Sequence, residues 1–229
     1  MGSDNQVDQT SEGDTFEKFY GNKKYYSVVK RSNDYVENWI KTESNGKVFL
    51  DYACGNGTNA RLAAKNGALL SLGLDISSVS IENAKKFAAE ENLNNVRFFQ
   101  ADAENTLLEE NSIDAIICSG MLHHLDLSYA FPELRRILKP GGKFYCMEFS
   151  KPKSIPLSKI YSYYKSNFIP LFGKVFARNQ EAYNYLNESI DMFPNQEILK
   201  NKIEHAGFRS VKYTNLFDGI VSIHTGFKY

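Results

Sequence analysis

The sequence predicts an α/β fold, a doubly wound and mostly parallel seven-stranded sheet covered by helices. Two observations indicate this fold. From residue 47 onward, short apolar runs typical of buried strands alternate with amphipathic stretches typical of helices, which predicts parallel strands joined by right-handed crossovers. The chain then ends in two strand-like runs separated by Phe217-Asp218-Gly219, which predicts a C-terminal antiparallel hairpin.

The expected elements follow one another in a regular order. The strands are short runs rich in aliphatic, β-branched or aromatic residues, and we place them at residues 47–53, 69–76, 96–100, 113–118, 143–149, 210–216 and 220–228. The helices are longer stretches with apolar residues at helical spacing, and we place them at residues 59–65, 80–91, 129–138 and 196–206.

Two aromatic-rich segments lie outside this alternation. We expect residues 1–14, which are polar, to form a disordered tail, and residues 15–229 to form a single domain. Within that domain, segments 15–45 and 151–195 do not fit the strand–helix pattern. Because ligands of doubly wound sheets bind beyond the carboxyl ends of the strands, we expect both segments to form a helical lid there. The alternative is that their aromatic side chains only pack a helical subdomain.

Composition excludes several classes of function. Lys+Arg and Asp+Glu both number 27, so the net charge is zero and no nucleic-acid partner is expected. No stretch approaches the ~20 apolar residues of a membrane span, and no secretory signal is evident. The cysteines lack metal-ligand spacing and favour buried, reduced thiols, so we expect a cytoplasmic protein that binds no metal. The three are Cys54, Cys118 and Cys146.

The strongest local signal is the run DYACGNG at residues 51–57, where a buried strand enters a turn of small residues before a helix. Gly55 and Gly57 allow a sharp turn and leave room for a ligand against the backbone. Asp51 and Ala53 precede them. The spacing is neither that of the dinucleotide-binding GxGxxG motif nor that of a phosphate-binding loop. The turn therefore predicts a ligand site without identifying the ligand.

Polar side chains also stand at the ends of the next three strands. Asp75, followed by Ile76, ends the second strand, and its carboxylate can accept hydrogen bonds from both hydroxyls of a ribose. Asp102, followed by Ala103, ends the third strand, and Ser119 ends the fourth. Since parallel strands end at the same edge of a sheet, these groups should converge on one crevice with the glycine turn.

Together, DYACGNG, GLDIS at 73–77, QADAE at 100–104 and RILKPGGKF at 136–144 resemble the class I S-adenosylmethionine-dependent methyltransferases, over about residues 46–150. The resemblance implies a Rossmann-like methyltransferase fold with S-adenosylmethionine as cofactor. It implies that Asp75 holds the ribose, that Asp102 holds the adenine amino group with help from the Ala103 backbone, and that the turn faces the methionine part. An aromatic face such as that of Tyr25 can stabilise the sulfonium by a cation–π contact. The expected cofactor-binding residues are Asp51, Ala53, Gly55, Gly57, Asp75, Ile76, Asp102, Ala103, Ser119 and Tyr25.

Residues 147–228 resemble a narrower group, the ubiquinone/menaquinone-pathway C-methyltransferases of the UbiE/MenG type. The resemblance is carried by MEFSKP at 147–152, YNYLNESI at 183–190, AGF at 206–208 and GIVSIH at 219–224. It implies a quinol or similar electron-rich ring, methylated at carbon, and peripheral membrane contact if that substrate is prenylated. The chain departs from the group in residues 15–45, and after the fourth strand, where SGMLHHL at 119–125 replaces an AFGxRN-like run.

The paired histidines of this run are the candidate catalytic residues. A phenol with a pKa of about 10 is a poor nucleophile at neutral pH, and a histidine with a pKa of about 6.5 can take its proton. We favour His124 as the base over His123. The alternative is that one ring packs against the cofactor and the other caps a helix. The expected substrate-binding residues come from the two lid segments and are Tyr20, Tyr164, Tyr183 and Tyr185.

Two other functions stay open on the sequence alone. The protein could methylate oxygen or nitrogen of another small metabolite, or it could bind the cofactor without catalysis. Intact acids at positions 75 and 102 and an aromatic-rich lid disfavour a non-catalytic binder, which needs no shaped substrate chamber. The oligomeric state is not predicted.

Overall fold

A computed structural model describes residues 23–152, 154 and 192–229 of the chain, with side chains from residue 33 onward. It divides into two compact units, residues 1–38 and residues 39–229. Helix α2 (Lys23–Glu43) begins in the first unit and ends in the second. Part of the expected lid segment 15–45 is therefore helical. Residues 15–22 and 155–191 of the two expected lid segments lie outside the described residues.

The second unit contains the seven strands that the sequence predicts, each within a few residues of its expected position except β5. They are β1 (Val48–Tyr52), β2 (Leu70–Asp75), β3 (Val96–Gln100), β4 (Ile113–Ser119), β5 (Leu138–Phe149), β6 (Arg209–Leu216) and β7 (Val221–Phe227). Strand β5 starts earlier than expected because Leu138 already pairs with Ile113 of β4, before an irregularity that carries Pro140 and two glycines; regular pairing resumes at Lys143.

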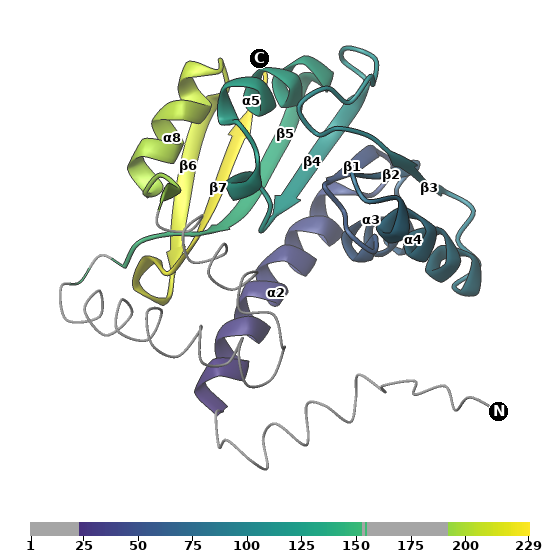
Figure 1. Cartoon of the computed structure of the whole chain (residues 1–229), viewed down its shortest axis with the longest axis horizontal. Coiled ribbons are helices and arrows are strands. Elements are labelled where there is room, and N and C mark those ends of the chain that lie inside the picture. The colour runs from purple at the N-terminus through teal and green to yellow at the C-terminus, as the bar shows by residue number, and fades with distance from the viewer. Residues whose placement is uncertain (1–22, 153, 155–191) are drawn as a thin grey trace. The chain divides into compact units, whose positions relative to one another are not determined.

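The seven strands form one sheet in the order β3-β2-β1-β4-β5-β7-β6 (Figure 1). Strands β1 to β5 pair in parallel, and β7 runs antiparallel to both β5 and β6. The doubly wound sheet and the C-terminal hairpin are thus confirmed. The chain first builds outward from β1 to β3 and then in the other direction from β4, so the order reverses between β1 and β4. Ligand sites of doubly wound sheets lie at this reversal.

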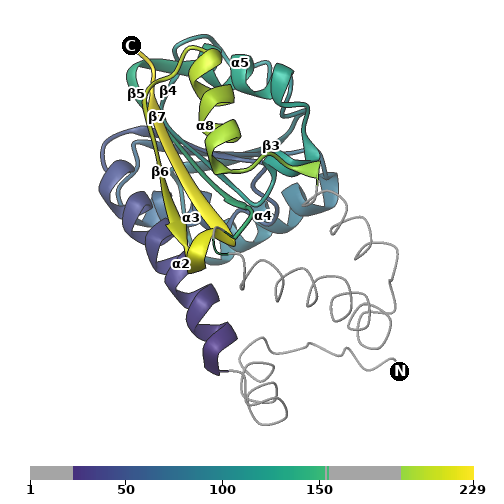
Figure 2. The same ribbon diagram turned by 90° about the vertical axis from the view of Figure 1, so that its left-hand side faces the viewer.

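Helices connect the strands and cover the sheet. The remaining elements are α3 (Thr58–Lys65), α4 (Ser78–Glu90), α5 (Leu127–Ile137), α8 (Gln196–His205) and the 3-10 turns η1 (Leu122–His124) and η3 (Phe217–Gly219). Helices α5 and α8 lie on the same side of the sheet (Figure 2). They share one core with β5, made by Phe131, Leu134, Phe144, Cys146, Leu199 and Ile203. None of the helices in the described ranges has the length and apolar character needed to span a bilayer.

The turn between β1 and α3 is unusual because three of its residues have positive φ. Ala53 has φ 58°, Gly55 51° and Gly57 74°. A Cβ on Gly57 would lie 2.4 Å from the ring of Phe98, so packing alone requires glycine there. A Cβ on Gly55 would meet nothing within 4 Å, so this glycine borders open space instead. Ala53 carries the left-handed conformation with a Cβ, which costs about 1–2 kcal/mol.

We therefore expect Ala53→Gly to raise the free energy of unfolding by roughly 0.5–1 kcal/mol. The relief of left-handed strain exceeds the extra conformational entropy that glycine brings to the unfolded chain. Urea unfolding of the two proteins measures the difference. Gly57→Ala, made in the same turn, should have the opposite sign because its Cβ meets Phe98. An Ala53→Gly protein less stable than the parent would contradict the strain.

Candidate active site

The carboxyl ends of the parallel strands bring the predicted polar groups to one edge of the sheet. Tyr52, the last residue of β1, pairs with Leu74 of β2 on one side and with Cys118 of β4 on the other. Asp75 pairs with Gln100, so β2 and β3 end side by side, and Ser119 ends β4 beside Met147 of β5. The glycine turn, both acids and the histidine pair all follow these strand ends. The predicted groups therefore lie along one edge of the sheet.

Asp75 holds the glycine turn against the start of α4. Its Oδ2 accepts the backbone N–H of Gly55 at 2.8 Å, and its Oδ1 accepts the N–H of Ser77 at 2.9 Å. Ser77 in turn caps α4, because its side chain accepts the N–H of Ser80. Each carboxylate oxygen can accept two hydrogen bonds, so one acceptor position on each oxygen is left for a ligand hydroxyl. Asp75 is therefore a structural link that also has acceptor positions to offer to a ribose.

Asp51 lies deeper, under the start of α3. Its Oδ2 accepts the N–H of Ala60 at 3.0 Å, and its Oδ1 lies 3.4 Å from the amide nitrogen of Asn59. Its side chain thus caps the helix that follows the turn. Burial raises the pKa of Asp51 from 3.8 to about 7, and the negative charge of Asp75 adds to the rise. The hydrogen bonds from Ala60 and Asn59 offset only part of the cost of burying the charge.

The loop after β3 presents Asp102 to solvent. Asp102 is exposed, and its Oδ1 accepts the N–H of Glu104 at 2.8 Å. Glu104 in turn accepts the N–H of Asp126, which ties this loop to the start of α5. Ala103 is buried and its carbonyl accepts a hydrogen bond from the Tyr52 hydroxyl. The side chain of Asp102 keeps its second oxygen for a ligand.

Two further predicted residues lie at strand ends. Ile76 follows Asp75 and is 69% exposed, an unusual position for a large aliphatic side chain. Ser119 is partly buried at the end of β4, where the N–H of the next residue, Gly120, donates to the Met147 carbonyl. At this strand end the exposed Ile76 offers an apolar face to a flat ring, and the neighbouring Asp75 offers acceptor oxygens to a sugar.

The two histidines of η1 have very different surroundings. The side chain of His123 is only 4% exposed, and its Nδ1 lies 3.0 Å from Oε2 of Glu148. His124 is exposed, and its ring centroid lies 4.0 Å from that of His123. Partial burial lowers the pKa of His124, and the neighbouring His123 lowers it further. The structure therefore gives a carboxylate partner to His123, whereas the sequence favoured His124.

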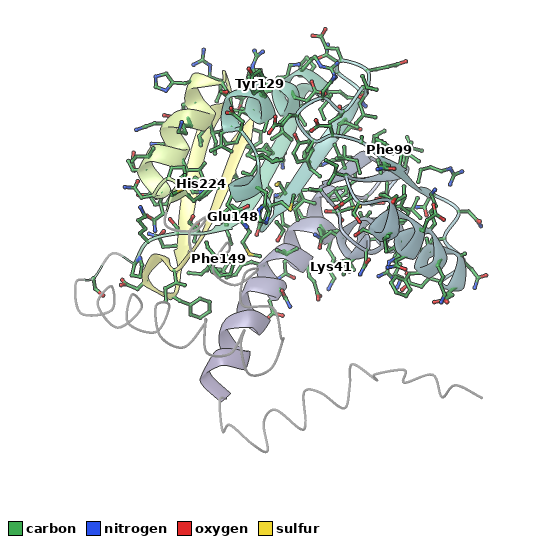
Figure 3. All side chains as sticks on the ribbon, viewed as in Figure 1. Lys41, Phe99, Tyr129, Glu148, Phe149 and His224 are labelled. Carbon is green, nitrogen blue, oxygen red and sulfur yellow. The ribbon has the colours of Figure 1, made fainter. Side chains whose placement is uncertain are left out.

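Glu148 is the residue that sequence reasoning missed. It lies near the carboxyl end of β5 (Figure 3), with a side chain that is fully buried. Besides His123, it contacts the backbone of η1, since its Oε1 accepts the N–H groups of Met121 and Leu122, both at 2.6 Å. In the sequence, the one signal for Glu148 as a site residue is its charge within the otherwise apolar run 144–149.

Several expected site residues cannot be placed. Tyr20, Tyr164, Tyr183 and Tyr185 lie outside the described residues, and the side chain of Tyr25 in α2 does as well. Cys118 and Cys146 are buried as expected, Cys54 is partly exposed, and all three are free thiols. Within the described ranges, no three of the His, Cys, Asp and Glu side chains come together as metal ligands would.

The side chains present fit S-adenosylmethionine. The open space beside Gly55 can admit the methionine part against the backbone, and a Cβ there would protrude into that space. Asp75 offers acceptors for the ribose hydroxyls, Ile76 an exposed apolar face for the adenine ring, and Asp102 an acceptor for the adenine amino group.

The raised pKa of Asp51 predicts a pH-dependent stability. Its folded value of about 7 exceeds its usual 3.8, so between these values the folded chain binds more protons than the unfolded chain. The stability that this protonation contributes is complete below pH 4 and is lost as the pH rises through 7. Relative to Asp51→Asn, the parent should lose about 4 kcal/mol across this window. Urea unfolding at a series of pH values measures it, and parallel stability curves would contradict it.

Comparison with known proteins extends these findings. The model of the ubiE/COQ5 methyltransferase family matches residues 28–228. The ubiquinone/menaquinone biosynthesis C-methyltransferase UbiE of Rickettsia bellii is 42% identical over 187 residues, which cover 79% of this chain and 75% of the relative. The enzyme of the same name from Idiomarina loihiensis is 39% identical over 191 residues, covering 80% and 75%. The resemblance seen in the sequence is confirmed.

Solved structures agree on the fold. Phosphoethanolamine N-methyltransferase 2 of Haemonchus contortus, in complex with S-adenosyl-L-methionine, has a TM-score of 0.66 and 16% identity, covering 86% of this chain and 52% of that one. The cyclase SpnF has a TM-score of 0.64 and 18% identity, covering 85% and 81%. At such identities the likeness shows the fold alone. The family match decides the class: this chain belongs to the ubiE/COQ5 methyltransferase family and is an S-adenosylmethionine-dependent methyltransferase.

Proposed function

We propose that the protein transfers a methyl group from S-adenosylmethionine to a ring carbon of a quinol. The relatives named for C-methylation in ubiquinone and menaquinone biosynthesis support the acceptor class. The observation that carries the chemistry is the histidine pair of η1, at the edge of the sheet where the cofactor-binding groups gather. A carbon acceptor of this class needs a base beside it, because its ring is activated when the phenolic proton leaves.

The residues at the strand ends hold the cofactor in this proposal. Asp75 accepts hydrogen bonds from the ribose, Asp102 from the adenine amino group, and the Ala53–Gly57 turn borders the methionine part. When bound, S-adenosylmethionine supplies a methyl group on a positive sulfur, whose bond to that methyl breaks with its electron pair left on sulfur. Binding the acceptor in line with that bond is the task of the protein.

The histidine pair removes the proton. An imidazole nitrogen of η1 takes the phenolic proton, and the electron density released into the ring makes the ring carbon the nucleophile that bonds to the methyl group. The ring carbon then loses its own hydrogen as a proton, which restores aromaticity, and the phenolate oxygen takes back the proton that the imidazole holds. The balanced products are S-adenosylhomocysteine, the methylated quinol and one proton. His123 is the better placed of the two because Glu148 holds its Nδ1 at 3.0 Å.

The expected location of the protein and its membrane contact follow from the chemistry of the acceptor. A prenylated quinol resides in a membrane, so the protein would work in the cytoplasm with a peripheral membrane contact and without nucleic acid. The predicted tyrosines of the two lid segments, Tyr20, Tyr164, Tyr183 and Tyr185, would line the acceptor side in this proposal.

Replacing Asp75 tests the cofactor site. We expect Asp75→Ala to weaken S-adenosylmethionine binding by about 1–3 kcal/mol, which is the usual cost of losing a charge-assisted hydrogen bond. Because Asp75 also holds Gly55 and Ser77, Asp75→Asn serves as the matched variant that keeps one acceptor oxygen for the turn. Titration calorimetry measures both. An Asp75→Ala protein that folds and binds with parental affinity would remove this residue from the ribose role.

Replacing each histidine tests the reaction. The parent protein is incubated with labelled S-adenosylmethionine and a panel of quinols, phenols and amines, and the methylated atom is identified by mass spectrometry and NMR. Label on a quinol ring carbon supports the proposal, whereas label on oxygen or nitrogen refutes it.

The variant that removes the base, His123→Gln or His124→Gln, should lower kcat by about 10²–10⁴-fold while cofactor affinity stays near parental.

The acidity of the acceptor supplies the control for this experiment. A phenol that is already ionised at the assay pH needs no base, so it should partly rescue the variant that lacks one. Equal losses for acidic and ordinary phenols would instead assign the histidine a packing role. A loss confined to His124→Gln would favour the exposed ring that the sequence indicated.

A further inference from the structure

Glu148 has both carboxylate oxygens committed to a single neighbouring turn. Its Oε1 accepts the backbone N–H groups of Met121 and Leu122 at the start of η1, and its Oε2 faces Nδ1 of His123. On the neighbouring strand β7, Ser222 stands directly opposite Glu148. The Ser222 hydroxyl is buried and has no hydrogen-bond partner within the described part of the chain. The carboxylate is thus directed at η1 and not at the neighbouring strand β7.

We propose that Glu148 is a positioning residue that fixes the tautomer and the ring orientation of His123 as the base of this methyltransferase. This inference rests on the proposed function, since it needs a proton to be removed. An ionised carboxylate only accepts hydrogen bonds, so the nitrogen that faces it must carry a hydrogen. His123 then holds its proton on Nδ1 and its lone pair on Nε2.

The remaining nitrogen is left for the acceptor. Among the described residues, Nε2 of His123 makes no hydrogen bond, so none of their groups competes for its lone pair. The edge contact with Phe193, at 6.4 Å between ring centroids, packs against the ring without using a nitrogen. The two backbone bonds to Oε1 hold Glu148 itself, so the whole arrangement depends on η1 and β5 staying together. When His123 becomes an imidazolium, the same carboxylate stabilises its positive charge.

The arrangement differs from a purely structural cap in one testable respect. A cap requires only an acceptor for the N–H groups of Met121 and Leu122, and the oxygen of a glutamine side chain can provide it. Its amide nitrogen would then face His123 with a hydrogen and would favour the opposite tautomer, with the hydrogen on Nε2. Glu148→Gln therefore separates the two roles: the turn can be kept while the lone pair is moved to the wrong nitrogen.

The first measurement is the tautomer of His123 in the full-length protein. The chain has only four histidines, so ring nitrogen signals in protein labelled with ¹⁵N-histidine can be assigned by comparison with His123→Gln and His124→Gln. We expect the Nδ1–H form in the parent and the Nε2–H form in Glu148→Gln. A parent protein with the Nε2–H form overturns the inference outright, whether or not any Glu148 variant folds.

The second measurement is turnover with a quinol acceptor. Glu148→Gln should lower kcat by about 10²–10³-fold and leave cofactor affinity within about threefold of the parent. Glu148→Asp, which retains the charge, should keep the Nδ1–H form and recover part of the loss. The double variant with His123→Gln should lose no more than His123→Gln alone, because Glu148 acts through that ring.

Glu133→Gln is the matched control. Glu133 is also a buried glutamate that accepts a backbone N–H, from Thr106, but it pairs with Arg136 and not with a histidine. Glu133→Gln should change neither the His123 tautomer nor the fold-loss of kcat that Glu148→Gln causes. Equal effects of the two variants on the tautomer and on turnover would overturn the positioning role. If the parent methylates no quinol at all, the proposed function fails, whereas the tautomer measurement judges the Glu148–His123 pair independently.

Discussion

The link between the Asp75 carboxylate and the backbone of Gly55 is the interaction on which this site depends. The chain must turn within Ala53–Gly57 at the point where the strand order reverses, and it does so with three residues at positive φ. The backbone holds this turn by only a few hydrogen bonds, among them those from Cys54 N–H to the Leu74 carbonyl and from Gly57 N–H to the Cys54 carbonyl. Asp75 holds it from the next strand and, through Ser77, also holds the start of α4. One side chain therefore fixes both the glycine turn and the start of the helix beside it.

Buried carboxylates perform the same task around the whole edge of the sheet. Asp51, Asp75 and Glu148 each accept at least one backbone N–H from a loop or helix start beyond a strand end. Hydrogen bonds to a charged acceptor are roughly twice as strong as neutral ones, which suits segments without regular structure. The cost is desolvation, and it is visible at Asp51, whose pKa burial raises to about 7. A preorganised site is obtained at the expense of stability near neutral pH.

The fold was predictable because it depends on periodicity, which is local. Strand positions, the parallel order and the terminal hairpin all follow from alternating runs, and they are confirmed. The early start of β5 was not predictable, because Leu138 pairs across a Pro-Gly-Gly irregularity that interrupts the apolar pattern. Asp75 and Asp102 could be found because acids at strand ends are conspicuous in sequence.

The contacts of those residues could not be predicted in the same way. That Asp75 reaches Gly55, or that Glu148 reaches η1, depends on side-chain directions between segments far apart in the chain. Glu148 in particular lies inside an apolar run. Strand periodicity predicts that this residue belongs to a strand, but it does not explain why the side chain there is charged. The sequence could name His123 and His124 together but could not separate them, because adjacent residues in a 3-10 turn differ only in what packs around them.

The chemistry of this protein must come from its loops, since the fold is shared by proteins with different activities. The structural relatives include a phosphoethanolamine N-methyltransferase and a cyclase at similar TM-scores. What differs between such proteins is the set of groups that follow the strands. In this chain a histidine pair stands after β4, where the sequence departs from the AFGxRN-like run of the group that it resembles. The histidine of this loop has a partner on the adjacent strand, because the buried carboxylate of Glu148 in β5 lies 3.0 Å from Nδ1 of His123. The group that distinguishes this loop is therefore held by a contact between loop and strand, and not by the loop alone.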